Sequence, residues 1–194
     1  MQPPAEHVHW MFATGFLLIG LCLLARAIVG DEIWSRRSWR AYLWPSLLFV
    51  MGVLMWPVMV FYTNSTIHMV AHGAWAQTMM FAGAAELGLV RGKLRATAWR
   101  LAVPFAFVVS GIAILVHEQN GWFFARAAFL HHAIGWTVII GALFPLVGAF
   151  RRRSPVWSGG FALTMIVLAV FLYSDRDVAP IFGHLSQLAG EQHR

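Results

Sequence analysis

Apolar residues fill six long stretches of the chain, and short polar connections separate them. A helix needs about 20 apolar residues to cross the roughly 30 Å hydrocarbon core of a bilayer. Each stretch is close to that length, so the pattern predicts an all-α polytopic bundle of about six transmembrane helices. The expected spans cover residues 10–29, 42–62, 67–90, 98–116, 126–150 and 156–173.

The composition agrees with a single transmembrane domain over residues 1–194. Hydrophobic residues make up 59% of the chain and charged residues only 11%, too few to cover a water-soluble domain of this size. The first stretch does not read as a signal peptide, because no basic residue precedes it and Asp31 and Glu32 follow it. The single cysteine, Cys22, excludes an intrachain disulfide and a thiolate cluster.

The basic residues indicate an orientation. Eleven of the fourteen lie in or beside the connections after the first, third and fifth stretches. By the positive-inside rule these connections are cytoplasmic, and both termini are extracytoplasmic, as expected for a plasma (inner) membrane protein. The same distribution explains the net charge of +6 and the pI near 10.7 without a nucleic-acid partner. The eleven are Arg26, Arg36, Arg37, Arg40, Arg91, Lys93, Arg95, Arg100, Arg151, Arg152 and Arg153.

In this topology all nine histidines lie on the extracytoplasmic side. Any one of them is explained by hydrogen bonds to loops or water at the interface, but a shared depth in several spans favours a common site. Imidazole nitrogens are ligands for zinc, copper and iron. The sequence therefore predicts a transition-metal site, with copper or zinc favoured and iron as an alternative. Its candidate ligands are His9, His68, His72, His117, Glu118, His131 and His132.

Helical spacing refines this prediction. His68 and His72 are four residues apart, so both project from one face of the third span. His131 and His132 diverge by about 100° around a helix, so one can face the bundle while the other points sideways. Single residues from three spans are enough for a three- or four-ligand site.

Three other features lie away from these ligands. Glu86 is about 21 Å along the helix from His72, and either pairs with nearby arginines or serves as a proton relay. Pro57 and Pro145 predict kinks that can shape a cavity. Residues 178–188 are expected to form a short interfacial helix.

Short motifs resemble the transmembrane protein 45 family, also called domain of unknown function 716. His9 opens an apolar span with glycines at positions 15 and 20, and the third span carries His72, Gly83 and Glu86 in one helix. His117 and the later pair His131 and His132 resemble the histidine-rich loop and histidine pair of that family.

The likeness extends over residues 9–150, with two departures from the family pattern. Glu118 and Gln119 follow His117, where the family has histidines two apart, and a proline-glycine turn after the first histidine is absent. The resemblance implies that His9, His72, His117 and the His131/His132 pair share one site. It implies no activity.

Three functions fit these residues. The first is a metal-dependent redox or hydrolytic reaction on a lipid or small apolar substrate, with Glu118 as general base beside a metal-bound water. The second is electron transfer through a b-type haem held by one histidine from the third span and one from the fifth. The third is a non-catalytic metal carrier or accessory subunit of a membrane complex. The number of histidines favours a metal ion over haem.

Overall fold

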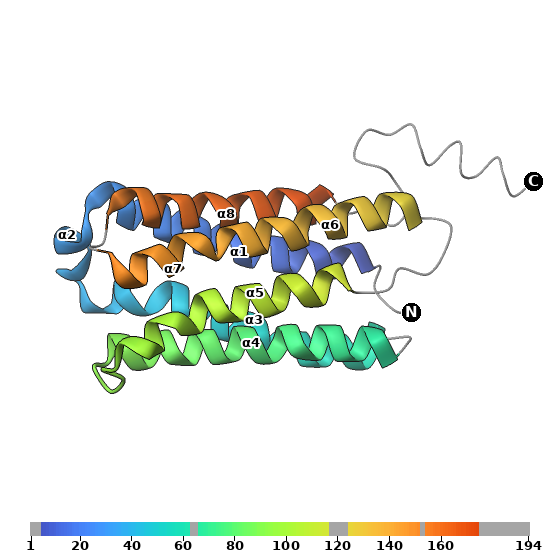
Figure 1. Cartoon of the computed structure of the whole chain (residues 1–194), viewed down its shortest axis with the longest axis horizontal. Coiled ribbons are helices and arrows are strands. Elements are labelled where there is room, and N and C mark those ends of the chain that lie inside the picture. The colour runs from blue at the N-terminus through green and yellow to red at the C-terminus, as the bar shows by residue number, and fades with distance from the viewer. Residues whose placement is uncertain (1–4, 63–65, 117–123, 152–153, 175–194) are drawn as a thin grey trace, which may run out of the picture.

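The computed structural model describes residues 5–62, 66–116, 124–151 and 154–174, and these form helices and connections without a strand. Six helices of 14 residues or more run side by side along the long axis of the molecule (Figure 1). They are α1 (Ala5–Val29), α3 (Leu43–Tyr62), α4 (Thr66–Val90), α5 (Ala102–Leu115), α6 (Phe124–Gly141) and α8 (Pro155–Ser174). The shorter elements are α2 (Asp31–Ser35), η1 (Ser38–Tyr42), η2 (Thr97–Leu101) and α7 (Leu143–Phe150).

Among the residues that the structure describes, five segments are long and apolar enough to cross a membrane, which confirms the prediction of an all-helical protein built from apolar helices. They cover His7–Val29, Ser38–Val60, Thr97–Leu115, Phe129–Phe150 and Val156–Ser174. The remaining long helix, α4, is 25 residues long but is less apolar, because His68, His72, Gln77 and Glu86 lie within it.

The fifth predicted span, over 126–150, corresponds to one apolar segment, Phe129–Phe150, and its helix is interrupted once, where a kink was expected near Pro145. Helix α6 ends at Gly141 and α7 begins at Leu143. Pro145 explains the position of the break, because proline has no N–H to bond the carbonyl of residue 141 and its ring clashes with that carbonyl. Pro57, in contrast, lies inside a continuous α3. The expected helix over 178–188 lies outside the described residues.

The six long helices form a closed ring. Going round it, α1 packs against α3, α3 against α4, α4 against α5, α5 against α6, α6 against α8, and α8 against α1. Side chains fill the middle of this ring, since Phe12 and Phe16 of α1 reach Trp75 of α4 at ring-centroid distances of 5.1 and 6.2 Å. Phe107 of α5 likewise meets Phe161 of α8 at 5.2 Å.

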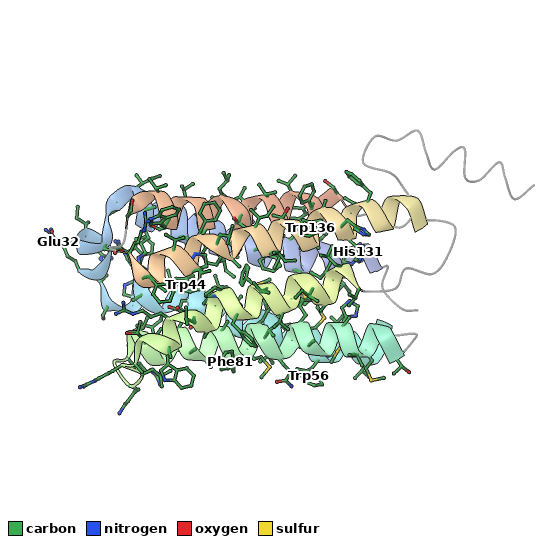
Figure 2. All side chains as sticks on the ribbon, in the orientation of Figure 1. Glu32, Trp44, Trp56, Phe81, His131 and Trp136 are labelled. Carbon is green, nitrogen blue, oxygen red and sulfur yellow. The ribbon has the colours of Figure 1, made fainter. Side chains whose placement is uncertain are left out.

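The outside of the ring is apolar. Trp56 of α3, Phe81 of α4 and Trp136 of α6 are 43, 44 and 54% exposed, and Figure 2 labels all three on the bundle. Apolar surface distributed over so many helices is unfavourable in water and favourable in hydrocarbon. The exterior therefore fits contact with lipid.

Glycines allow α3 and α4 to approach each other closely. A Cβ atom added at Gly83 of α4 would lie 2.7 Å from the Phe49 nitrogen and 2.8 Å from the Pro45 carbonyl oxygen of α3. A Cβ at Gly52 of α3 would lie 2.7 Å from the Ala76 carbonyl oxygen of α4. Small residues at helix crossings are the usual way in which membrane helices gain backbone contact.

A buried hydroxyl pair joins α4 to α5, and we expect its loss to have a small effect. The Thr78 and Ser110 hydroxyl oxygens are 2.8 Å apart, and the Thr78 hydroxyl is also 2.9 Å from two carbonyl oxygens of its own helix. Ser110→Ala leaves Thr78 with those acceptors, so we expect it to lower the free energy of unfolding by about 1 kcal/mol or less. Unfolding in detergent micelles would measure this, and a loss above about 3 kcal/mol would contradict it.

Candidate functional site

Three helices begin at the same end of the bundle. In Figure 1, α1, α4 and α6 start at the end where α8 finishes, and α2 lies at the opposite end. We call the first the histidine end, because it carries His7, His9, His68, His72, His131 and His132. We call the other the arginine end; Figure 2 shows His131 at the first and Glu32 at the second. The sequence-based expectation that these histidines share one end of the bundle agrees with the fold.

His9 is the outermost member of the core-facing stripe of α1. The residues three, four and seven positions further on, Phe12, Ala13 and Phe16, are all buried. This is the spacing of one helix face. His9 is itself half-buried, and its Nδ1 atom is shielded from solvent.

His72 occupies the corresponding position on α4. Trp75 is half-buried, and Ala76 and Met79 are buried, at the same three offsets. Because Trp75 contacts Phe12 across the ring, and both helices start at the histidine end, His9 and His72 each lie one turn outside a contacting pair. The two half-buried imidazoles therefore sit at a similar depth on inward faces.

His131 repeats this arrangement on α6. Ile134, Gly135 and Val138 are buried at the same offsets, and His131 is half-buried while His132 is exposed. The expected divergence of this adjacent pair thus places His131 on the side of the core. His9, His72, His131 and His132 each make at least one polar, ring or electrostatic interaction.

The other predicted ligands lie outside what the structure describes. His117 and Glu118 fall in the gap between residues 116 and 124. The backbone of His68 belongs to α4, one turn before His72, but its side chain is not described. The proposed catalytic role of Glu118 consequently stays a prediction.

The donor atoms fit a transition metal by type but are not assembled in the described residues. Among side chains that the structure describes, no three from His, Cys, Asp and Glu are grouped closely enough to hold one ion. Imidazoles from three helices are nonetheless the donors that zinc and copper accept. A complete site therefore needs rotation of the described imidazoles or a further ligand from His68, His117 or Glu118.

The side chains packed beneath the histidines occupy the space that a haem would need. Phe12, Phe16 and Trp75 fill the ring directly below His9 and His72. A nearby cavity lined by Phe16, Trp75 and Ser110 measures only about 10 Å³. A porphyrin between α4 and α6 at this depth would have to displace these side chains, whereas a single ion would not.

Residues at the arginine end form a feature that the sequence reasoning missed. Glu86, which was expected either to pair with Arg91 or Arg95 or to serve as a proton relay, is half-buried and lines a large cavity there together with Pro145. The arginines of this end were interpreted only as a topology signal. Of the two prolines that were expected to shape a cavity, Pro145 lines this one and Pro57 does not.

No protein-family model, curated protein or solved structure matches this chain. The likeness to the transmembrane protein 45 family therefore remains a prediction that rests on the short motifs quoted above.

Proposed function

We propose that this is an integral membrane protein of six spans that binds a transition-metal ion at its histidine end. In this proposal α4 is the sixth span, since it packs between α3 and α5 in the ring despite its polar residues. The arginine end is cytoplasmic, because the basic connections gather there, and both termini are extracytoplasmic.

One observation carries the proposal: a half-buried histidine begins the core-facing stripe of each of three helices. His9, His72 and His131 all occupy this position, on α1, α4 and α6. A helix needs no ionisable residue there, because an apolar side chain would extend the stripe at lower cost. A common ligand explains three imidazoles at one end more simply than three separate roles would.

The chemistry follows from the donors. Neutral imidazole nitrogens bind copper, zinc or iron, and a carboxylate such as Glu118 would add charge or act as a base beside a metal-bound water. Redox or hydrolytic catalysis on a lipid or small apolar substrate remains one form of the proposal. Metal carriage, alone or as an accessory subunit, is the other.

The test is metal analysis of the full-length protein, purified in detergent from cells grown without added metal, together with its visible absorption spectrum. We expect about one equivalent of copper, zinc or iron per chain and no Soret band. Stoichiometric haem with a Soret band would replace the metal ion by the haem hypothesis. Protein free of metal and haem that also fails to take up copper or zinc in a titration would overturn the proposal.

A further inference from the structure

A cavity of about 910 Å³ lies at the arginine end of the bundle. It is bounded by α1, α3, α4, α5, α7 and α8 and by the connections that contain α2, η1, η2 and Arg151. Part of its wall follows the α6–α7 break, through Phe144, Pro145 and Gly148. Its size is within the range of about 300–1,000 Å³ typical of small-molecule sites.

The lining has an apolar floor and a cationic mouth. Leu23, Trp44 and Phe161 are buried and line the floor. Arg100 and Arg151 line the same cavity, but both side chains are exposed. Arg100 lies in η2 and Arg151 directly follows α7, so neither belongs to a helix that supplies the floor. An amphiphilic ligand would match both layers, with its apolar part inside and its polar part at the mouth.

The charges at the mouth do not cancel. Arg26 is occupied by Asp31, with Nε 2.6 Å from the carboxylate oxygen Oδ1. Glu32 has Arg36, at 3.9 Å, as a neighbour outside the lining. The whole lining carries four arginines, Arg26, Arg95, Arg100 and Arg151, and three carboxylates, Asp31, Glu32 and Glu86.

One guanidinium group therefore exceeds the carboxylates of the lining. Within the described part of the chain, neither Arg100 nor Arg151 has an ion pair. Guanidinium groups bind phosphate oxygens with paired, charge-assisted hydrogen bonds. The cavity therefore favours an anionic ligand.

The Trp34 indole forms part of the cavity wall. The indole N–H of Trp34, a lining residue, is shielded from solvent and has no hydrogen-bond acceptor among the described residues. Because water does not reach this nitrogen, the N–H does not face the open cavity, and Trp34 contributes its ring to the wall. The indole ring is already held by the Arg40 guanidinium, which lies 5.4 Å from its centroid.

We propose that this cavity binds an amphiphile with an anionic, phosphate-bearing head group. The phosphate oxygens accept hydrogen bonds from the arginines at the mouth, and the apolar portion lies against Leu23, Trp44 and Phe161. This site is at the opposite end of the bundle from the histidines, and the proposal does not depend on the metal.

Native mass spectrometry of the delipidated full-length protein would test this, in titrations with phosphatidylglycerol and with phosphatidylcholine. We expect one phosphatidylglycerol to bind roughly ten times more tightly than phosphatidylcholine. The double variant Arg100→Gln/Arg151→Gln should weaken phosphatidylglycerol binding about tenfold or more. Arg91→Gln and Trp39→Phe are matched controls, because both residues are exposed and neither lines the cavity.

The proposal is overturned if the two lipids bind equally, or if the control variants weaken binding as much as the cavity variants. A fold defect is separated from a binding defect by Gly148→Leu. A Cβ at Gly148 meets only Trp157, at 3.9 Å, so this change should be tolerated while it reduces the space in the cavity. We expect it to lower phosphatidylglycerol binding without lowering the unfolding temperature, and unchanged binding would count against the site.

A competition arm distinguishes the two sources of the head group. If glycerol 3-phosphate displaces phosphatidylglycerol at similar concentration, the ligand is a water-soluble phosphate ester, and if it does not, the ligand is a membrane lipid. Both outcomes support a phosphate-binding site. Metal content should be the same in the cavity variants and the wild type, so failure here would leave the function proposed for the histidine end unaffected.

Discussion

Gly83→Leu is expected to lower the free energy of unfolding by about 3 kcal/mol or more, enough to prevent most of the protein from being recovered folded. The atoms in the way are backbone atoms of α3, the Phe49 nitrogen at 2.7 Å and the Pro45 carbonyl oxygen at 2.8 Å. No rotamer change can move them, so α3 and α4 must separate. Separation also breaks the reciprocal contact at Gly52, which would place a Cβ 2.7 Å from the Ala76 carbonyl oxygen.

Gly159→Leu is the matched control for this substitution. Gly159 lies in α8, and nothing is within 4 Å of a Cβ added there. This variant should stay within about 0.5 kcal/mol of the wild type. Size-exclusion chromatography in detergent and an unfolding titration would measure both variants, and equal behaviour of the two would show that the α3–α4 contact is looser than described.

His72→Ala should remove most of the metal while the bundle stays folded. Its imidazole is half-buried on the inward face of α4, one turn outside Trp75. Changing residues that only orient metal ligands already costs roughly 10–100-fold in affinity, so losing a ligand should cost at least about 100-fold. His131→Ala should behave alike, because His131 occupies the same position on α6.

The control for these variants is His132→Ala, because His132 is exposed beside the half-buried His131. It should retain nearly all of the metal. Elemental analysis after buffer exchange gives the stoichiometry, and circular dichroism reports whether each variant keeps its helices. Full metal occupancy in folded His72→Ala would remove His72 from the site, and equal losses in all three variants would indicate an unspecific effect.

The apolar stretches predicted the long helices well because membrane insertion depends on length and hydropathy, which are local properties. The expected span over 42–62 became α3 at Leu43–Tyr62, and the one over 67–90 became α4 at Thr66–Val90. Kinks were expected at both Pro57 and Pro145, but α3 continues through Pro57, whereas α6 ends at Gly141, four residues before Pro145. The packing partners of each helix decide between these outcomes, and a hydropathy pattern does not reveal which helices pack together.

The site was predictable in position more than in detail. Helix direction alone placed His9, His72 and His131 at one end. Their shared place at the head of a buried stripe was hidden in the sequence, because these helices are apolar on every side and the core-facing side does not stand out. The cavity at the arginine end was missed for a related reason, since residues such as Leu23, Arg100 and Phe161 are far apart in the chain.

The closure of the ring by α1 and α8 has a consequence for biogenesis. Helix α1 is the first of the long helices to leave the ribosome and α8 the last, yet they pack together closely, with Gly20 of α1 against Ala162 of α8. Until α8 is inserted, the face of α1 that will contact it has only lipid or the insertion machinery as a neighbour. Such a late, long-range pairing is slow and exposes intermediates to misassembly. A nascent chain stalled before residue 155 should therefore be held by the insertion machinery and be sensitive to quality-control proteases. A chain that includes α8 should be released and resistant, because α8 then covers the exposed face of α1.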